Sequence, residues 1–325
     1  HYGELIWPQI YNRPPLLTNE DIEIIREMED AVGVRRILMH DTDHEAHWKR
    51  CVDNNEPLTR PQFMRARTMY DRLGTKYGFE KLGHKVRFHD PKFSESKFED
   101  LLNAEIIYIC VPTPSNEDGS CNVSIVQGVV DSLMKTNYQG VIAIKSTVEP
   151  GTTQALIEQY HNDKICFVPE FLRERCAFTD FTENHEVLAV GTSSDEVYDK
   201  VVKSHGKYPN QYAKLSSTEA ELLKYYSNIF NALRIIFANE MYEICKVLGA
   251  DYTKVKDTFV MRGTAKDIYM DVNESFRGYG GVCLPKDTKA IDALVKKFGL
   301  DLKLFETIDK ENDKFTTTVF EGMRK

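Results

Sequence analysis

Short apolar runs and amphipathic stretches alternate along the chain from about residue 84 to residue 190. Continuous apolar runs are typical of strands buried on both faces of a parallel sheet, whereas apolar residues at three- and four-residue spacing indicate helices. Strands are predicted over Lys85–His89, Glu105–Val111, Gly140–Lys145, Ile165–Val168 and Val187–Val190. Helices are predicted over Val123–Lys135 and directly after Thr153, and no strand is expected beyond Val190. This alternation predicts an open, mostly parallel α/β sheet, whose ligands bind at the carboxyl ends of the strands.

The second half of the chain has a different pattern, because apolar residues keep helical spacing from about residue 212 onward. One long helix is predicted over Ser217–Leu248, with Ser217 and Thr218 as caps and Gly249 as the stop. Further helices are predicted over Asp251–Val260, Thr288–Lys297 and Asp301–Asn312. The pattern therefore predicts an α/β domain over 81–211, followed by an all-helical domain over 212–325.

Residues 1–80 form an atypical N-terminal segment with a weaker pattern. Helices are predicted over Asn19–Ala31 and Arg60–Tyr77, with a short strand at Arg36–Met39 between them. The cluster His40–His47 has the spacing of a metal site if it is helical. Because no second group of ligands accompanies it, a polar turn is the expected structure and no metal is expected.

Composition narrows the class of protein. A chain of 325 residues is too long for one ordinary core, and 42% hydrophobic with 28% charged residues indicates a soluble globular protein. The net charge of −8 disfavours nucleic acid as a partner. No apolar run approaches the roughly 18 residues of a membrane span. Seven cysteines without a repeated spacing fit reduced thiols. We therefore expect a cytoplasmic protein without membrane or nucleic-acid partners.

The most specific chemistry lies between Gly278 and Asp287, where the sequence reads Gly-Tyr-Gly-Gly-Val-Cys-Leu-Pro-Lys-Asp. Glycines let the backbone turn sharply and approach a substrate closely. Cys283 has a cation, Lys286, three residues later, and the thiolate form of cysteine is the nucleophile. A buried structural cysteine beside a loop is the commoner case among proteins. The surrounding residues favour the nucleophile here.

This run resembles the active-site loop of the nucleotide-sugar dehydrogenases, the UDP-glucose and GDP-mannose 6-dehydrogenase family. Five further segments match the same family in the same order, so that the resemblance spans about residues 83 to 312. They are the end of the first predicted strand at Asp90, Val111–Pro114, Lys145–Thr153, Pro169–Glu174 and Glu219–Asn228. The resemblance implies that 81–211 is a Rossmann-like domain that binds NAD, and that 212–325 is a central domain through which the protein dimerises.

The resemblance also implies a set of site residues. The catalytic residues would be Cys283, Lys224, Asn228, Asp287, Glu170 and Thr147. The cofactor would contact Asp90, Val111, Pro112, Thr113, Thr147, Glu174 and Lys286. The sugar substrate would contact Glu170, Phe171, Leu172, Arg173, Lys224, Phe276, Tyr279 and Gly280.

Several of these residues have physical arguments of their own. An acidic group such as Asp90 at a strand end suits the ribose hydroxyls of NAD and repels the 2′-phosphate of NADP. Thr147 is expected at a strand end just before a helix N-terminus, which suits anions. Glu170 and Glu174 share a face if their segment is helical. Each feature alone also fits an ordinary turn or a solvated charge, and only the combined motifs favour a site.

By resemblance, the reaction oxidises a primary alcohol to a carboxylate in two hydride transfers to NAD. Water held by Thr147, Asp287 and Lys224 would take the first proton, and Cys283 would then attack the aldehyde to give a thiohemiacetal. The second oxidation would leave a thioester, which water activated near Glu170 and Asp287 would hydrolyse. The product would be a uronic acid for polysaccharide synthesis.

Two departures from the family keep alternatives open. The glycine-rich turn that normally holds the NAD pyrophosphate is missing about twenty residues before Asp90, and Gly74 and Gly78 are wrongly spaced to replace it. The segment 1–80 is therefore expected to be atypical, or part of a modified Rossmann domain. The second α/β domain of the family is also missing after the helical domain, as in a fragment or a compact variant. A weakly active or inactive relative that acts as a binding or assembly module is the alternative. A hydroxyacid dehydrogenase is disfavoured, because it needs no cysteine nucleophile.

Overall fold

The computed structural model describes residues 75–91, 96–172, 177–272, 274, 277–281 and 283–315. The elements predicted before residue 75, and the His40–His47 cluster with them, lie outside these residues. Contacts divide the chain into two compact units, with a boundary inside one long helix between Tyr225 and Tyr226. The domain boundaries at residues 80 and 211 remain predictions.

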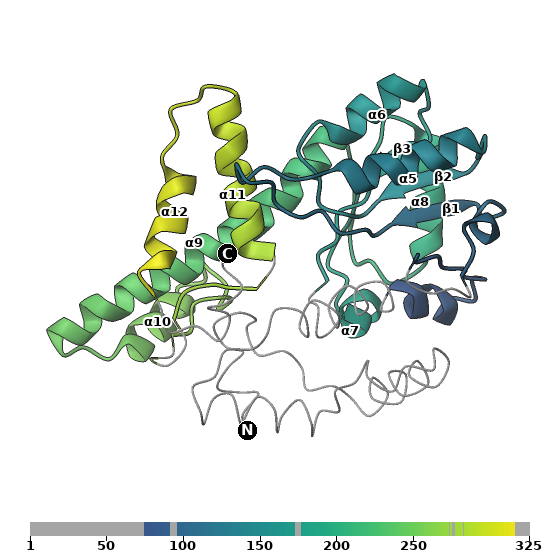
Figure 1. The fold of residues 1–325 in the computed structure, drawn as a ribbon. Helices are drawn as coiled ribbons and strands as arrows, with labels where there is room; N and C mark the ends of the chain where they lie inside the picture. Colours follow the sequence, from purple (N-terminus) through teal and green to yellow (C-terminus); the bar gives the residue numbers. More distant parts are fainter. Residues whose placement is uncertain are drawn as a thin grey trace. The chain divides into compact units, whose positions relative to one another are not determined.

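The first unit is built on a five-stranded sheet whose strands follow one another in chain order (Figure 1). The strands are β1 (Ile106–Ile109), β2 (Val141–Ile144), β3 (Ile165–Phe167), β4 (Leu188–Gly191) and β5 (Tyr212–Leu215). The first three strands are parallel, and β4 joins β3 antiparallel through the single pair Phe167 and Gly191. β5 then runs parallel to β4. The sheet is mostly parallel, as predicted.

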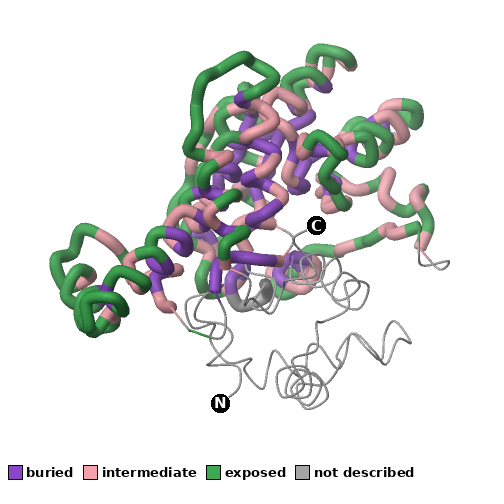
Figure 2. The backbone as a smooth tube through the Cα atoms, turned by 60° about the vertical axis from the view of Figure 1, so that its left-hand side comes forward, coloured by how far each residue is buried: buried purple, intermediate pink, exposed green. Residues whose placement is uncertain are grey.

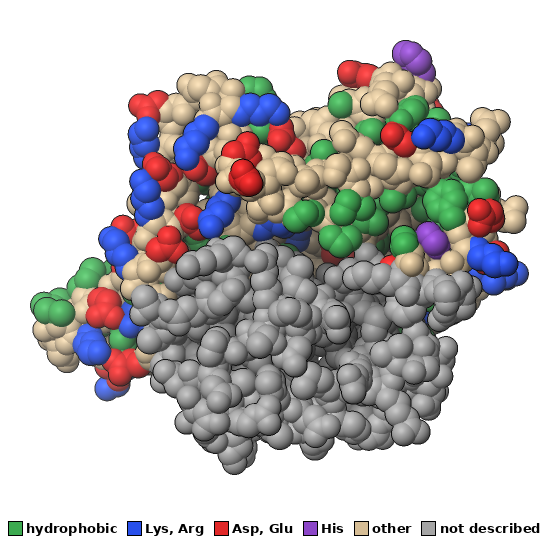
Figure 3. Space-filling model, viewed as in Figure 1, with side chains coloured by type: hydrophobic (Ala, Val, Ile, Leu, Met, Phe, Trp, Pro, Cys, Tyr) green, Lys and Arg blue, Asp and Glu red, His purple; other side chains and the backbone are tan. Residues whose placement is uncertain are grey.

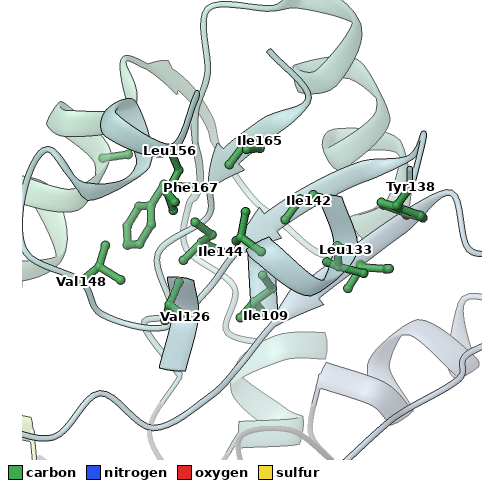
Figure 4. Packing of buried hydrophobic residues seen from close by; sticks show 13 residues of the cluster. Ile109, Val126, Leu133, Tyr138, Ile142, Ile144, Val148, Leu156, Ile165 and Phe167 are labelled. Atoms are coloured by element: carbon green, nitrogen blue, oxygen red, sulfur yellow. The ribbon is translucent and has the colours of Figure 1, made fainter. Parts of the chain in front are cut away.

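Helices cover both faces of this sheet, and alternate residues of β2, which lies between β1 and β3, enter two different cores. Ile142 and Ile144 pack with buried residues of α5 (Ser124–Lys135) and α6 (Thr152–Tyr160) (Figure 4). Val141 and Ala143 pack instead with buried valines of α8 (Asp195–His205). All four β2 residues are buried, which explains their continuous apolar run.

The prediction of a strand over Lys85–His89 is wrong, since residues 84–90 form no regular element. Most of these residues are exposed, and no strand of the described sheet pairs with them, so the apolar positions bury too little to fix a strand. The prediction that no strand follows Val190 is also wrong. β5 was missed because its Tyr-Ala-Lys-Leu sequence alternates exposed and half-buried residues instead of forming an apolar run. The helical elements missed are η1 (Phe98–Leu101), α7 (Ala177–Thr182) and α8.

The second unit is helical, which confirms the predicted architecture. Its elements are α9 (Ser217–Leu248), which crosses from the first unit, α10 (Tyr252–Met261), α11 (Cys283–Lys297) and α12 (Leu304–Asp313). The bounds of α9 match the prediction, and Gly249 ends the helix with a φ of 67°. Its cap is one residue earlier than expected. Ser216 and Glu219 form a reciprocal capping box, with Glu219 N–H donating to Ser216 Oγ and Ser216 N–H donating to Glu219 Oε2.

Charge is balanced locally on the second unit. Figure 3 shows basic and acidic side chains interleaved over α11 and α12, where Lys296 pairs with Asp292 and Lys310 with Glu306. Exposed residues dominate the end of α9 and the turn into α10 (Figure 2). None of the helices in the described ranges combines the length and the apolar character needed to cross a membrane.

A cluster of aromatic rings packs beside β1 in the first unit. The Phe79 ring stacks on Tyr108 and meets the ring of the fully buried His205 edge-on, each at 5.1 Å between centroids. The ring of Phe181 covers Gly78 so closely that a Cβ atom there would overlap it. Gly78 therefore serves the packing of Phe181 on the helical residues 75–81. It does not stand in for the missing glycine-rich turn.

His205 should make stability depend on pH. Burial, together with the charge of Lys145, holds the pKa of His205 well below 6.5. The unfolded chain takes up this proton near pH 6.5 and the folded chain only at lower pH, so stability is present above pH 6.5 and is lost as the pH falls below it. Urea denaturation followed by circular dichroism should show a loss of up to about 1.4 kcal/mol per pH unit.

The variant His205→Phe should flatten this dependence between pH 7 and pH 5. Part of it will remain, because burial also lowers the pKa of His185. The exposed His161 supplies the control, and His161→Asn should retain the dependence of the parent. Equal slopes for the parent and His205→Phe would contradict the assignment.

Candidate active site

The carboxyl ends of β1 and β2 are joined through one serine. Ser146 Oγ accepts the N–H of Val111 at 2.8 Å and donates to the Val111 carbonyl at 2.7 Å. Thr147 follows on the same strand end, half-buried, and its carbonyl accepts from Cys121 Sγ at 3.5 Å. Thr113 is buried, whereas Pro112 is exposed. Strand ends of this kind are where open α/β sheets bind ligands.

A buried cation organises the end of β3. Lys145 Nζ lies 3.0 Å from Glu170 Oε2, and the Lys145 side chain is only 4% exposed. Glu170 Oε1 accepts the N–H of Leu172 at 2.9 Å, so both carboxylate oxygens are engaged. Residues 168–172 are not helical, so a helical turn that would place Glu170 and Glu174 on one face does not begin at Glu170. Glu170 is instead fixed by its ion pair and by the backbone of its own segment.

Lys224 belongs to the same group of side chains. It lies on α9, is nearly buried, and its Nζ donates to the Glu170 carbonyl at 2.5 Å. The same Nζ lies 5.6 Å from the centre of the Phe171 ring. The first unit therefore brings together Lys145, Glu170, Phe171 and Lys224.

The N-terminus of α6 is occupied by the protein itself. Glu221, fully buried on α9, accepts the N–H of Gly151 at 2.6 Å and the N–H of Thr153 at 2.8 Å. Burial raises the pKa of Glu221, and these hydrogen bonds offset part of that rise. The sequence suggested that this helix end was suited to an anion. The anion it receives in the structure is the Glu221 carboxylate.

The second unit holds the cysteine. Cys283 is the first residue of α11, five residues before the predicted start of that helix. Pro285 fits the first turn, where its missing N–H has no helical partner to lose. The N-terminus of a helix carries a partial positive charge. Lys286 was expected to supply a full positive charge near the sulfur, yet its Nζ lies 2.6 Å from Asp287 Oδ1.

Asp287 links α11 to α9. It is fully buried, and its Oδ2 accepts from Asn228 Nδ2 at 2.5 Å. Asn228 lies one helical turn beyond Lys224 on α9. The second unit therefore joins Asn228, Lys286 and Asp287 close to the helix start that carries Cys283.

Other predicted site residues have different surroundings. Asp90 lies in the irregular stretch 84–90, where its N–H donates to Ser96 Oγ at 3.2 Å, so it does not end a strand. Tyr279 is fully buried, with its hydroxyl 3.5 Å from Asp309 Oδ1, and Gly280 is buried beside it. The predicted residues that lie outside the described ranges are Arg173, Glu174 and Phe276.

Sequence reasoning missed two residues, Lys145 and Glu221, whose buried contacts hold the candidate site residues of the first unit in place. Lys145 carries a signal, because a lysine directly after four apolar strand residues is expected to need a buried partner. Glu221 carries a weaker one, since it lies three residues before Lys224 on the same helix and reads as an ordinary helix charge. Their partners are 25 and 70 residues away in sequence, beyond the reach of local patterns.

Comparison with known proteins identifies the family. Residues 78–205 match the NAD binding domain, and residues 218–314 the central domain, of the UDP-glucose/GDP-mannose dehydrogenase family. The chain belongs to this family. The chain is 31% identical over 290 residues to the UDP-glucose 6-dehydrogenase of Rickettsia bellii, with 84% of this chain covered.

Solved structures of the family agree with the fold. A UDP-glucose dehydrogenase from Pyrobaculum islandicum superposes with a TM-score of 0.66 at 25% identity, over 74% of this chain and 65% of that one. A UDP-D-ManNAc dehydrogenase from Pyrococcus horikoshii gives a TM-score of 0.62 at 18% identity, over 76% of this chain and 66% of that one, which supports the fold alone. The chain spans 65% of the length of the Rickettsia bellii enzyme.

The Glu221 cap should be measurable as stability. Glu221→Ala removes the acceptor for two N–H groups and should cost about 1–3 kcal/mol. Glu221→Gln keeps one oxygen and should cost less. The control is Glu158→Ala on the exposed face of α6, expected within about 0.5 kcal/mol of the parent. Thermal or urea unfolding followed by circular dichroism gives the free energy of unfolding of the three variants. Equal losses of this free energy in Glu221→Ala and Glu158→Ala would contradict the cap.

Proposed function

We propose that this protein oxidises the primary alcohol of a nucleotide sugar to a carboxylate, as an NAD-dependent 6-dehydrogenase with UDP-glucose as the first candidate substrate. One observation carries the proposal. Asn228, paired with the buried Asp287 near the start of the cysteine helix, lies one turn from Lys224 on the continuous helix α9. The names of the relatives support the substrate class.

The described residues fit NAD only in part. Val111, Thr113 and Thr147 at the ends of β1 and β2 are the proposed cofactor contacts, and the two threonines carry hydroxyls suited to it. Gly78 and the α6 N-terminus offer no room for a pyrophosphate, because Phe181 and Glu221 fill them. NAD, when bound, supplies the hydride acceptor for each oxidation.

Lys224 and Asn228 are the proposed donors to oxygen. An alkoxide or tetrahedral oxyanion needs preorganised hydrogen-bond donors, which these two side chains carry. Asn228 is held by Asp287, so its free N–H has a fixed direction. By the family resemblance, Asp287 and Thr147 serve the removal of the alcohol proton through water, and Glu170 serves the later hydrolysis.

Cys283 explains how two oxidations follow each other on one substrate. Its sulfur forms a bond to the aldehyde carbon, whose oxygen gains a proton, and so holds the reactive aldehyde as a thiohemiacetal. After the second oxidation, water adds to the thioester and the C–S bond breaks. In sum, one alcohol and one water give one carboxylate, two hydrides and three protons.

The rival function is a binding or assembly module that has lost turnover. The packing of Phe181 on Gly78 favours it, because this glycine is committed to the core. A chain of this kind would keep the fold and bind a nucleotide sugar without forming NADH. Cytoplasmic location and the domain boundaries at residues 80 and 211 stay part of the proposal.

Turnover with UDP-glucose should yield two NADH for each sugar consumed. NAD binding is titrated first by calorimetry, and NADH is then followed at 340 nm while the uronate is quantified by mass spectrometry. One NADH per sugar would indicate a simple alcohol dehydrogenase. Saturable binding of NAD and UDP-glucose without any NADH would favour the binding module.

Cys283→Ser should stop the reaction at or before the ester stage, because a hydroxyl is a poorer nucleophile than a thiolate. We expect uronate formation to fall by at least about a thousandfold, roughly 4 kcal/mol of barrier. Cys245→Ala removes another thiol of the same unit and should leave turnover near that of the parent. Uronate made by Cys283→Ser at the parent rate would refute the covalent step.

Dimerisation is proposed along α9. Tyr226, Phe230, Phe237 and Ile244 are each 46–74% exposed, and the last three repeat every seven residues. Apolar residues at this spacing form a stripe that a second helix can cover. A second copy of this chain is the proposed partner, in keeping with the family resemblance.

Phe237→Glu should convert the dimer to a monomer, because it places a charge in the middle of the stripe. Sedimentation velocity at about 10 µM measures the change. Leu302→Glu, at another exposed apolar residue between α11 and α12, should remain dimeric. A parent protein that sediments as a monomer at this concentration would refute the proposed interface.

A further inference from the structure

Two buried polar side chains anchor the loop that leads to Cys283. Within residues 277–281, the side chain of Arg277 is held by α9 and the backbone of Tyr279 is held by α12. We infer that Asn312 and Arg277 are positioning residues, which fix the backbone from which the cysteine is presented. The inference rests on the proposed role of Cys283 and concerns contacts within the second unit.

Asn312 makes a two-point clamp on Tyr279. Its Oδ1 accepts the Tyr279 N–H at 2.7 Å, and its Nδ2 donates to the Tyr279 carbonyl at 3.0 Å. Asn312 is 1% exposed and the Tyr279 side chain is fully buried. Burying an amide without partners is costly, and here both ends of the amide serve one residue of the loop. The clamped residue is four positions before Cys283.

Arg277 makes a second anchor two residues earlier. Its Nε donates to Asn239 Oδ1, and its Nη2 donates to the Asn239 carbonyl at 3.0 Å. Its Nη1 lies 2.6 Å from Glu243, and the guanidinium centre lies 4.9 Å from the centre of the Tyr242 ring. A planar cation with donors in a fixed fork suits this arrangement, which lysine cannot reproduce.

The side chain of Asn239 is itself oriented. Its Nδ2 donates to the Ile235 carbonyl at 2.7 Å, which turns Oδ1 toward Arg277. Asn239 is fully buried. The hydrogen bonds of Arg277 therefore end on a buried side chain whose own orientation is fixed by the backbone of α9.

The backbone of the anchored loop depends on two glycines, one between the two anchored residues and one between Tyr279 and Cys283. Gly278 and Gly281 adopt φ values of 72° and 75°, a region that glycine enters without strain. Glycines also leave a loop free to move unless other contacts hold it. Asn312 and Arg277 supply those contacts, which is why the position of Cys283 should respond to both.

The test measures access to Cys283 in four purified full-length variants. Alkylation by iodoacetamide at pH 9.5, about one unit above the ordinary thiol pKa, reports access more than ionisation. Mass spectrometry of the Cys283 peptide gives its rate. We expect a rate increase of at least about threefold for Asn312→Leu, which loses both bonds, and a smaller one for Asn312→Asp, which keeps the acceptor. Arg277→Lys should also increase it, while Asp313→Ala, exposed on α12, should match the parent.

Activity gives an independent measure of positioning. Asn312→Asp should lower kcat about tenfold and leave the KM for NAD unchanged, since the family match places the NAD binding domain at 78–205. A variant that was merely less stable would lose active protein without changing the kcat of the folded fraction. A KM for NAD that rises by the same factor as kcat falls would contradict a positioning role.

Folding is checked inside the same samples. Cys245, buried in the same unit, should remain unalkylated in every folded variant. If Cys245 becomes alkylated in Asn312→Leu, that variant is not folded, and hydrogen exchange of the parent protein replaces it as the test. The clamp predicts that the Tyr279 amide of the parent exchanges on the order of a hundredfold slower than in a free peptide.

Unchanged Cys283 alkylation in folded Asn312→Asp and Arg277→Lys, or fast exchange at Tyr279, overturns the inference. Absence of NADH formation by the parent, with alkylation responding as expected, overturns the proposed function and leaves the two anchors in place. The two failures are therefore distinguishable.

Discussion

The carboxylate of Glu221 at the N-terminus of α6 is the contact on which the arrangement of the long helix depends. It satisfies two N–H groups that a helix start leaves without partners, and it does so from the second turn of α9. Gly191 allows the close approach, since a Cβ atom there would lie 2.7 Å from the Ala220 Cβ. With its first turns fixed on the sheet of its own unit, α9 places Lys224 against the Glu170 carbonyl. The positions of Asn228 and Asn239 along the helix then follow from its periodicity.

Buried charge is arranged in pairs in both units. Lys145 faces Glu170 and Lys286 faces Asp287, and each partner is mostly or fully shielded from water. Removing one member of such a pair leaves the other unpaired in a low dielectric, a loss of about 3–5 kcal/mol in typical cases. Forming such a pair also removes both charges from water, so its net contribution to stability is small. The two pairs lie at the ends of β2 and β3 and in the first turns of α11, where the proposed site needs fixed charges.

The sequence predicted the elements whose own residues carry an unbroken pattern. Val141–Ile144 is apolar and buried throughout, and Ser217–Leu248 keeps apolar residues at helical spacing along its whole length. The prediction failed at residues 84–90 and at Tyr212–Leu215, where exposure depends on partners far along the chain. The same reason limits the site. Motifs located Cys283, whereas the contacts of Glu221 and Asn312 depend on pairings that no local pattern encodes.

Protein groups fill both Gly78 and the helix start that the sequence suggested for an anion. Phe181 covers Gly78, and Glu221 occupies the N-terminus of α6, where a second anion would meet a carboxylate. The strand ends that carry Val111 and Thr147 remain the proposed contacts of the cofactor. Affinity for NAD, more than the presence of the cysteine, is therefore the property that separates an active dehydrogenase from a relative that keeps only its fold.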